Sequence, residues 1–450
     1  MTLAASPSPT LFGHPRGLTF LFATEMWERF SYYGMRALLV LYMVKYLFLP
    51  ERAESVAGYG ALKAALEAVF GPLGVQPFAS QVYGLYTALV YLSPILGGWL
   101  ADRVLGQRRM VVIGGVLMAI GHFLMASERW LLIALGFLIL GSGAFKPNIS
   151  TQVGHLYAPG DPRRDSAFSI FYVGINIGAF FSPLVCGSLA IAFGWHYGFA
   201  AAGVGMLIGL AIYLTGTSSL PRDALAKHDA APLSAQERRG LAGLAVLFLP
   251  MTLFWATYEQ QGNTIALWAE DYTRRGIDLF VWQGEFPAEW FQSFNPFMIF
   301  AFTPLVVALW AQQSKRGSEP LTASKMALGC FGVALANVVM IGAAVAVGDE
   351  GRASALWLIG YFILVTLGEL YLSPTSLSVV TKVAPVRVQS TVMGLSFATI
   401  FAGNFLAGWL GSFWTGTSKP AFFLMIALIA AAAGVLIVAL KRPLAGAISA

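Results

Sequence analysis

The chain reads Glu25-Met26-Trp27-Glu28-Arg29-Phe30-Ser31-Tyr32-Tyr33-Gly34-Met35-Arg36 near its start, within an apolar run over residues 18–48. Four charged side chains therefore fall inside a segment that is long enough to span a membrane. At 100° per residue, the charged and tyrosine side chains occupy an arc of about 140° on a helix. A charge at mid-bilayer costs about 3 kcal/mol or more, so such side chains nearly always face a bundle interior or a watery cavity. The stretch predicts a first helix whose polar face lines a cavity.

The composition supports a membrane protein. Of the 450 residues, 57% are hydrophobic and only 11% are charged, whereas soluble domains carry about 25% charged residues. The net charge of +6 does not come from dense basic clusters, so no nucleic-acid partner is expected. The two cysteines lie far apart in apolar runs, which predicts neither a disulfide framework nor a metal site. We expect no cofactor.

Apolar runs of about 20 residues mark membrane spans, and twelve of them occur. The sequence therefore predicts an all-α membrane protein with twelve transmembrane helices. The predicted spans are 18–48, 79–101, 109–127, 130–157, 166–193, 196–217, 241–269, 291–314, 323–347, 353–383, 388–414 and 420–440.

The distribution of basic residues orients these spans. With a cytoplasmic N-terminus, 17 of the 28 Lys and Arg residues fall on the inner side and 7 on the outer side, as the positive-inside rule requires. We expect a multi-pass protein of the cell membrane, in a bacterial inner membrane, with both termini cytoplasmic. The polar break 218–240 is interpreted as a cytoplasmic linker between two six-helix bundles, 1–217 and 241–450. Residues 56–70 are predicted to form a short outer helix, and 270–290 an outer interfacial loop.

Two motifs give the chain a family resemblance. The loop Gly98-Trp-Leu-Ala-Asp102-Arg103-Val-Leu-Gly106-Gln-Arg108-Arg109 resembles the loop signature of the major facilitator superfamily, which implies the major facilitator fold. For this loop, the resemblance predicts a tight turn at Gly106, with Asp102 and Arg103 in a structural role on the inner side of the membrane. The alternative is a generic basic turn.

The opening stretch itself, Glu25-x-x-Glu28-Arg29-Phe30-x-Tyr32-Tyr33-Gly34, resembles the first-helix signature of the proton-dependent oligopeptide transporters. The resemblance continues over nearly the whole chain, through Phe145-Lys146-Pro147-Asn148, Phe171-Tyr172-Val-Gly-Ile-Asn176-Ile-Gly178, Phe254-Trp255, Glu259-Gln-Gln-Gly262, Asn295-Pro296 and Gly368-Glu369 to Ser373-Pro374. Many bacterial members carry two extra helices between the halves, for which the break 218–240 is too short. The resemblance implies a proton-coupled symporter of di- and tripeptides that works by alternating access, with Glu259 paired to Arg36.

The intramembrane charges suit a zwitterionic ligand. Arg29 and Lys146 can hold a carboxylate, Arg29 bidentately, and Glu369 can hold an ammonium group. Amide side chains at Asn176 and Asn295 can bond to a peptide backbone of any sequence. Tolerant pocket walls with polar tips are expected from Tyr32, Tyr33, Tyr86 and Trp255. Proton coupling is expected from Glu25, Glu28, Arg36 and Glu259, because burial disfavours a charged carboxylate and a basic partner favours it.

Other readings of these residues stay open. The cluster of Glu25, Glu28 and Arg29 could be purely structural, Lys146 could reach the cytoplasm, Asn176 could join helices, and Tyr32 and Tyr86 could be packing residues. At the level of function, the alternatives are transport of another small anion such as nitrate, an integral-membrane enzyme, and a channel. Nitrate would not require Glu369. We find no nucleophile–base spacing or nucleotide loop, and no ring of like charges. We expect a functional monomer in the lipid bilayer.

Overall fold

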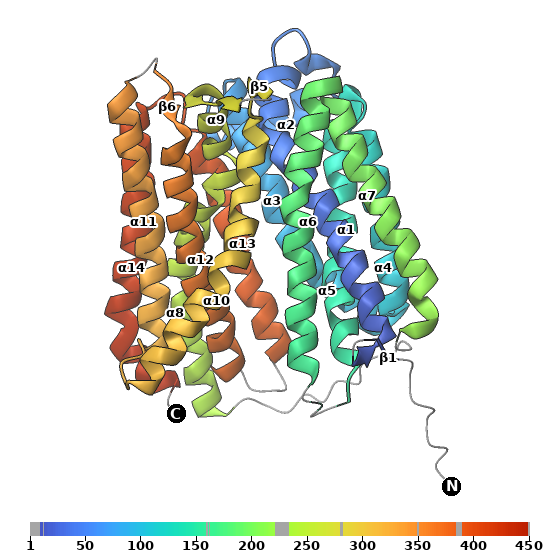
Figure 1. Cartoon of the computed structure of the whole chain (residues 1–450), viewed down its shortest axis with the longest axis vertical. Coiled ribbons are helices and arrows are strands. Elements are labelled where there is room, and N and C mark those ends of the chain that lie inside the picture. The colour runs from blue at the N-terminus through green and yellow to red at the C-terminus, as the bar shows by residue number, and fades with distance from the viewer. Residues whose placement is uncertain are drawn as a thin grey trace. The chain divides into compact units, whose positions relative to one another are not determined.

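The structure, a computed structural model, describes residues 10–11, 13–158, 161, 163–220, 234–279, 282–348, 351–383 and 389–448. The described chain is mostly helical (Figure 1). It divides into two compact units. The first unit comprises residues 1–38, 55–57 and 93–227, and the second comprises 39–54, 58–92 and 228–450.

The helices follow one another along the whole chain. They are α1 (Arg16–Tyr42), α2 (Tyr59–Phe70), α3 (Val75–Leu100), α4 (Gln107–Leu124), α5 (Leu131–His155), α6 (Arg163–Phe193), α7 (Trp195–Gly216), α8 (Ala235–Tyr258), α9 (Thr264–Asp271), α10 (Phe294–Lys315), α11 (Thr322–Val347), α12 (Ala355–Val383), α13 (Gln389–Gly411) and α14 (Lys419–Ile448). A π-helical turn, Met43–Leu47, extends α1, and a 3-10 turn, Glu259–Gly262, separates α8 from α9.

Each predicted span overlaps one of these long helices, and the predicted outer helix at 56–70 corresponds to α2. Among the described residues, nine helices are long and apolar enough to cross a membrane. The other three predicted spans correspond to α1, α4 and α13. In α1, the charges at 25, 28, 29 and 36 lower the apolar character of the segment. The full number of twelve spans stays a prediction.

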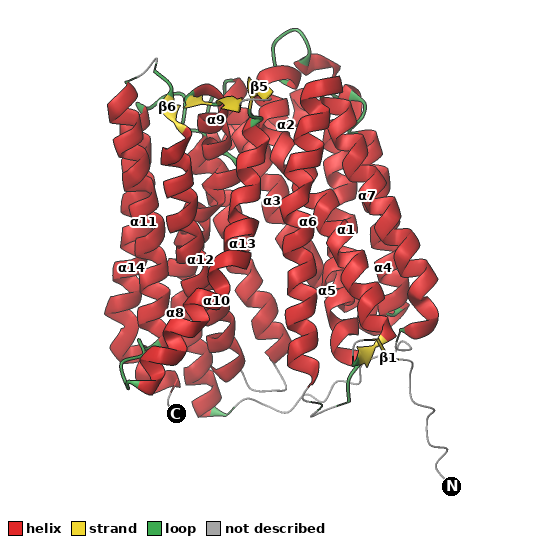
Figure 2. Ribbon diagram, viewed as in Figure 1, coloured by secondary structure: helices red, strands yellow, loops and turns green. Residues whose placement is uncertain are grey.

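The described residues form six short strands, two of them before α1 and four in connections between helices (Figure 2). They are β1 (Thr10–Leu11), β2 (His14–Pro15), β3 (Thr273–Arg274), β4 (Gly276–Leu279), β5 (Trp282–Glu285) and β6 (Ala353–Ser354). β1 pairs with β2 and β4 with β5, both antiparallel, while β3 pairs in parallel with β6. The segment 270–290, predicted as a loop, therefore contains a hairpin. The spans themselves are helical, as an all-α protein requires.

In the first unit, α4 packs against α5 and α7, and α6 packs against α7. The predicted turn at Gly106 is present: this glycine has a φ of 82° directly before α4, a conformation that favours glycine. Arg108, in the first turn of α4, donates a hydrogen bond to the carbonyl of Leu220. This bond ties the start of α4 to the chain that follows α7.

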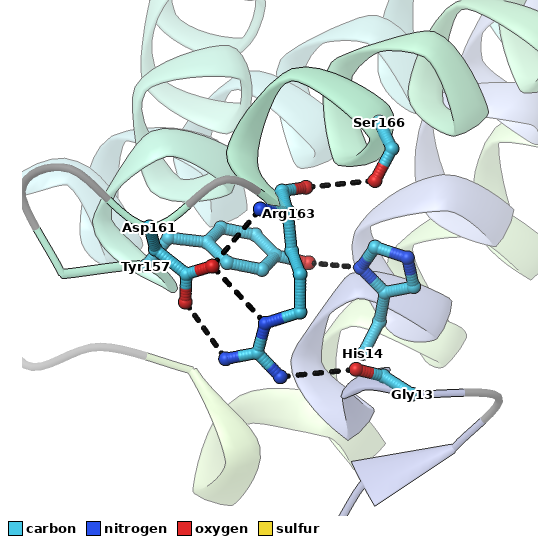
Figure 3. Close-up of polar contacts among 6 residues, drawn as sticks. All are labelled: Gly13, His14, Tyr157, Asp161, Arg163 and Ser166. Atoms are coloured by element: carbon cyan, nitrogen blue, oxygen red, sulfur yellow. Dashed lines mark hydrogen bonds and ion pairs between the residues drawn. The ribbon is translucent and has the colours of Figure 1, made fainter.

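A polar cluster joins the N-terminal hairpin to the connection between α5 and α6 (Figure 3). His14 Nδ1 lies 2.8 Å from the Tyr157 hydroxyl. Arg163 donates one hydrogen bond to the Gly13 carbonyl at 3.0 Å and a second to Asp161 Oδ2 at 2.7 Å. Hydrogen bonds from Arg163 lower the pKa of Asp161 to about 2, so this carboxylate stays ionised at neutral pH. The cluster anchors the chain immediately before α1.

In the second unit, α11 packs against α12 and α14, α8 packs against α13 and α14, and α10 packs against α12. Residues 39–54 and 58–92, which precede the predicted linker, belong to this unit. Lys45 forms an ion pair of 2.5 Å with Asp271. The predicted division at 218–240 follows chain order, whereas the compact units follow packing. The linker falls mostly on 221–233, outside the described residues, and the division into two six-helix bundles stays a prediction.

The start of α3 packs on α13 with backbones in direct contact. A Cβ built on Gly84 would lie 2.5 Å from Gly408 Cα and 2.9 Å from the Asn404 carbonyl oxygen, so neither helix has room for a side chain here. Hydrogen bonds run beside this contact. Gln76 donates to the Gly411 carbonyl at 2.9 Å, and the Ser80 hydroxyl donates to Asn263 Oδ1 at 2.7 Å.

Replacing Gly84 with alanine is expected to destabilise the protein by about 1–3 kcal/mol, because the added methyl group overpacks two backbones. The measurement is thermal unfolding of the purified protein in detergent. Gly60→Ala on α2 is the matched control, since nothing lies within 4 Å of a Cβ at Gly60. Alanine favours a helix over glycine by about 1 kcal/mol, so the control should keep or raise the unfolding temperature. Equal unfolding temperatures of the two variants would refute the close contact.

Candidate substrate-binding site

The opening stretch forms a buried ion cluster on α1. Arg29 Nε lies 2.7 Å from Glu25 Oε1 and 2.9 Å from Glu28 Oε2. Glu25 is 2% exposed and Glu28 is fully buried. The pairing of Glu25 with Arg29 follows from helical geometry, because residues four apart share a face, whereas Glu28 is adjacent to Arg29 in the sequence and meets it through the side-chain conformation of the arginine. The cluster confirms that the polar face of the first helix is turned inward in its unit.

Lys146 brings a second cation to this cluster. It lies on α5, next to Pro147 inside the helix, and its Nζ lies 4.2 Å from the centre of the Tyr32 ring. The Arg29 guanidinium lies 6.0 Å from the same ring. Tyr32 is 4% exposed and makes an edge contact with Tyr33 at 5.1 Å. The first unit thus places the cations of Arg29 and Lys146 near the Tyr32 ring. Two acids pair with the first of these cations.

Two further predicted residues belong to the same unit. Arg36 lies on α1, two turns beyond Arg29. Asn176 lies on α6, is 7% exposed, and donates from Nδ2 to the Tyr172 carbonyl of its own helix at 2.9 Å. One of the two donor hydrogens of this amide is therefore engaged within its own helix.

Glu369 is the centre of a polar network in the second unit. Its Oε2 accepts a hydrogen bond from the Tyr258 hydroxyl at 2.6 Å and another from Asn295 Nδ2 at 3.0 Å. Asn295 Nδ2 also lies 3.1 Å from Thr366 Oγ1. These side chains come from α8, α10 and α12. The structure thus brings the predicted Asn295 and Glu369 together.

Three other predicted residues lie in the second unit. Trp255 is 8% exposed and stands at an edge angle to Tyr258, with ring centres 5.4 Å apart. Glu259 is 2% exposed and begins the 3-10 turn after α8. Tyr86, on α3, is 2% exposed. Arg36 belongs to the first unit and Glu259 to the second, and their pairing stays a prediction.

Sequence reasoning missed Tyr258 as a partner of Glu369 and Thr366 as a partner of Asn295. Thr366 lies three residues before Glu369 on α12, so the helical repeat was a usable signal. The sequence signal for Tyr258 was weaker. It directly precedes Glu259, and the change from α-helix to 3-10 turn at this point alters the directions in which successive side chains leave the backbone.

The chemistry of the two units is complementary. The first unit offers cations that can bind a carboxylate. The second offers a carboxylate, already held by two donors, that can bind an ammonium group. Lys146, Asn295 and Glu369 lie on candidate membrane-spanning helices, and Arg29 lies on α1, which has 27 residues. Ionisable residues within membrane spans mark substrate and proton pathways. Fold and site together define a membrane transporter.

Comparison with known proteins narrows this class. The model of the family described as "POT family" matches residues 108–230 and 225–425. A di-/tripeptide transporter of Lactococcus lactis subsp. cremoris is 34% identical over 500 residues, which cover 97% of this chain and 97% of that protein. The crystal structure of a peptide transporter POT in complex with sulfate has a TM-score of 0.85 and 31% identity, covering 99% of this chain and 98% of the other.

A further crystal structure, of a POT family transporter in complex with 5-aminolevulinic acid, has a TM-score of 0.83 and 28% identity, with 97% and 98% of the chains covered. This chain belongs to the POT family, the proton-dependent oligopeptide transporters of the major facilitator superfamily. The resemblance found in the sequence is therefore confirmed. The protein is a multi-pass membrane transporter and not an enzyme.

Proposed function

We propose that the protein imports di- and tripeptides together with protons by alternating access. The peptide carboxylate is held by Arg29 and Lys146, and its amino end by Glu369. Asn176 and Asn295 bond to the peptide backbone, while Tyr32, Tyr33, Tyr86 and Trp255 line the space for its side chains. Glu259 with Arg36, and the cluster of Glu25, Glu28 and Arg29, carry the proton. The functional unit is a monomer.

The observation that carries this proposal is the hydrogen-bonded position of Glu369. Tyr258 and Asn295 donate to the same oxygen, Oε2, so the carboxylate is fixed, and an ionised carboxylate has about four acceptor sites with which it can bind an ammonium group. Charge-assisted hydrogen bonds of this kind are about twice as strong as neutral ones. A peptide needs such an acceptor for its ammonium group, and nitrate does not. This favours peptides over a simple anion.

The related structures support a ligand with both charges. The relatives include a di-/tripeptide transporter, and 5-aminolevulinic acid, bound by one POT structure, carries an amino group and a carboxylate as a peptide does. Arg29 and Glu369 supply one counter-charge for each end. A transporter of a simple anion would make no use of the Glu369 carboxylate.

Replacing Glu369 with glutamine is expected to weaken binding of a dipeptide by about 10- to 100-fold, since a hydrogen bond to a charged group contributes about 1.5–3 kcal/mol. Binding is measured by competition against a labelled dipeptide. The same dipeptide with an acetylated amino end should bind weakly to both proteins, with little difference between them. Glu285→Gln, an exposed acid of the same unit (67% side-chain exposure), is the control. If Glu369→Gln weakened binding of the free and the acetylated dipeptide equally, Glu369 would not be the group that binds the amino end.

A further inference from the structure

A polar cavity lies in the second unit, and none of the predicted site residues lines it. Its volume is about 420 Å³. Its walls come from the end of α10, the connection to α11, the first turn of α11 and the part of α12 that follows Pro374. The lining side chains include Trp310, Glu319, Thr322, Lys325 and Thr375.

Lys325 is the charged group of this cavity. It is 8% exposed, its Nζ lies 2.5 Å from Glu319 Oε1, and the same Nζ lies 3.9 Å from the centre of the Trp310 ring. The hydrogen bond from Lys325 lowers the pKa of Glu319, so Glu319 is ionised at neutral pH. One pair of ionic groups is thus fixed at the cavity wall, and a lysine ammonium has three donor hydrogens.

Trp310, Thr322 and Thr375 supply further hydrogen-bond donors to the lining of the cavity. The Trp310 Nε1 hydrogen is buried without an acceptor in the part of the chain that the structure describes. No hydrogen bond of the Thr322 or Thr375 hydroxyl is found among the described residues, although Thr375 is only 8% exposed. Buried donors are normally satisfied, and leaving one unsatisfied costs about 1–3 kcal/mol. A ligand rich in acceptor oxygens would satisfy all three.

The position of the cavity indicates where that ligand comes from. The candidate span that contains α10 ends at Lys315 and the next begins at Thr322, so the cavity lies at a membrane boundary, which the basic-residue distribution predicts to be cytoplasmic. Leu321 lines the cavity and is 62% exposed, and Leu309 and Leu377 are 42% and 41% exposed. The exposure of these apolar side chains suits contact with acyl chains. Lys315, the last residue of α10, and Arg316, which follows it, are exposed and add positive charge.

We propose that this cavity binds the phosphodiester headgroup of a phospholipid from the cytoplasmic leaflet. The phosphate oxygens accept from the Trp310 indole, the Thr322 and Thr375 hydroxyls and the Lys325 ammonium, and the acyl chains lie along the exposed leucines. Basic pockets between helices on the cytoplasmic side are suited to such headgroups. The site is independent of the peptide-binding residues, so it holds whether or not the proposed transport function does.

The test is lipid binding by the full-length, delipidated protein, measured by native mass spectrometry during titration with phosphatidylglycerol. The double variant Trp310→Phe/Thr375→Val keeps an aromatic ring at position 310 and the branched shape at position 375, but it removes two donors. Its affinity for the tightest-bound lipid should fall at least tenfold. Lys325→Gln should lower that affinity as much or more. Two controls should stay within twofold of the original protein: Thr303→Val, whose hydroxyl donates within α10 to Ile299, and Arg352→Gln, an exposed cation that does not line the cavity.

A soluble competitor separates the lipid from a free anion. Millimolar glycerol 3-phosphate should leave the bound phosphatidylglycerol in place, because it lacks the acyl chains. Thermal unfolding verifies that each variant is folded. Unchanged lipid affinity in both the double variant and Lys325→Gln would overturn the proposal. Displacement of the lipid by glycerol 3-phosphate at equal concentration would overturn the lipid assignment in favour of a soluble phosphate.

Discussion

Replacing Glu259 with glutamine is expected to abolish concentrative peptide uptake while leaving peptide exchange intact. Glu259 is 2% exposed and lies within a candidate membrane span, where ionisable residues mark substrate and proton pathways. A glutamine keeps the shape of the side chain but cannot bind or release a proton. Peptide could then still cross in either direction, with no coupling to the proton gradient.

The expected magnitude follows from the driving force. One pH unit corresponds to about 1.36 kcal/mol, so each coupled proton supports about tenfold accumulation of peptide across a gradient of one unit. Proteoliposomes with the original protein should approach the limit set by the number of protons coupled, and Glu259→Gln should give a ratio of about 1. Exchange of labelled for unlabelled dipeptide across the same vesicles is the control. Full accumulation by the variant would move the proton site elsewhere, and the pair of Glu25 and Glu28 is the next candidate.

Replacing Arg29 with glutamine should have the second large effect, on both stability and binding. Arg29 is the ion-pair partner of Glu25 and Glu28, which are 2% and 0% exposed. Removing one partner of a buried ion pair costs about 3–5 kcal/mol, because the remaining charge is left uncompensated. Thermal unfolding should show this loss, and dipeptide binding should disappear.

A second variant separates the structural role of Arg29 from its role toward the ligand. The triple variant Glu25→Gln/Glu28→Gln/Arg29→Gln has no uncompensated charge, so it should regain most of the lost stability. It should still fail to bind dipeptide, since the cation proposed for the carboxylate is absent. Dipeptide affinity equal to that of the original protein would show that the cluster is purely structural.

The first half of the site was largely predictable from the sequence. The pairing of Glu25 with Arg29 follows from the helical repeat, and the structure shows that Arg29 also contacts the adjacent Glu28. The location of the long helices was also predictable, because span length is set by the bilayer and each apolar run contains a helix. Local periodicity is sufficient wherever the interacting residues share one helix.

Contacts between helices far apart in sequence were less predictable. The bond from Tyr258 to Glu369 joins α8 to α12 across 111 positions of the chain, and its geometry depends on the 3-10 turn that begins at Glu259. The packing of Gly84 against Gly408 likewise places a segment from the first half of the chain in the second unit. The hairpin of β4 and β5 arises in a connection whose composition gave no alternating strand pattern. These features depend on tertiary packing, which a single sequence does not encode locally.

The central claim is that inward proton flow drives peptide accumulation. The most direct measurement is uptake of a labelled dipeptide into proteoliposomes under an inward proton gradient, with and without a protonophore. We predict accumulation above the external concentration that collapses when the protonophore is added and that unlabelled di- and tripeptides, but not nitrate, suppress. Uptake that never exceeds the external concentration, or that neither di- nor tripeptides suppress, would contradict the account.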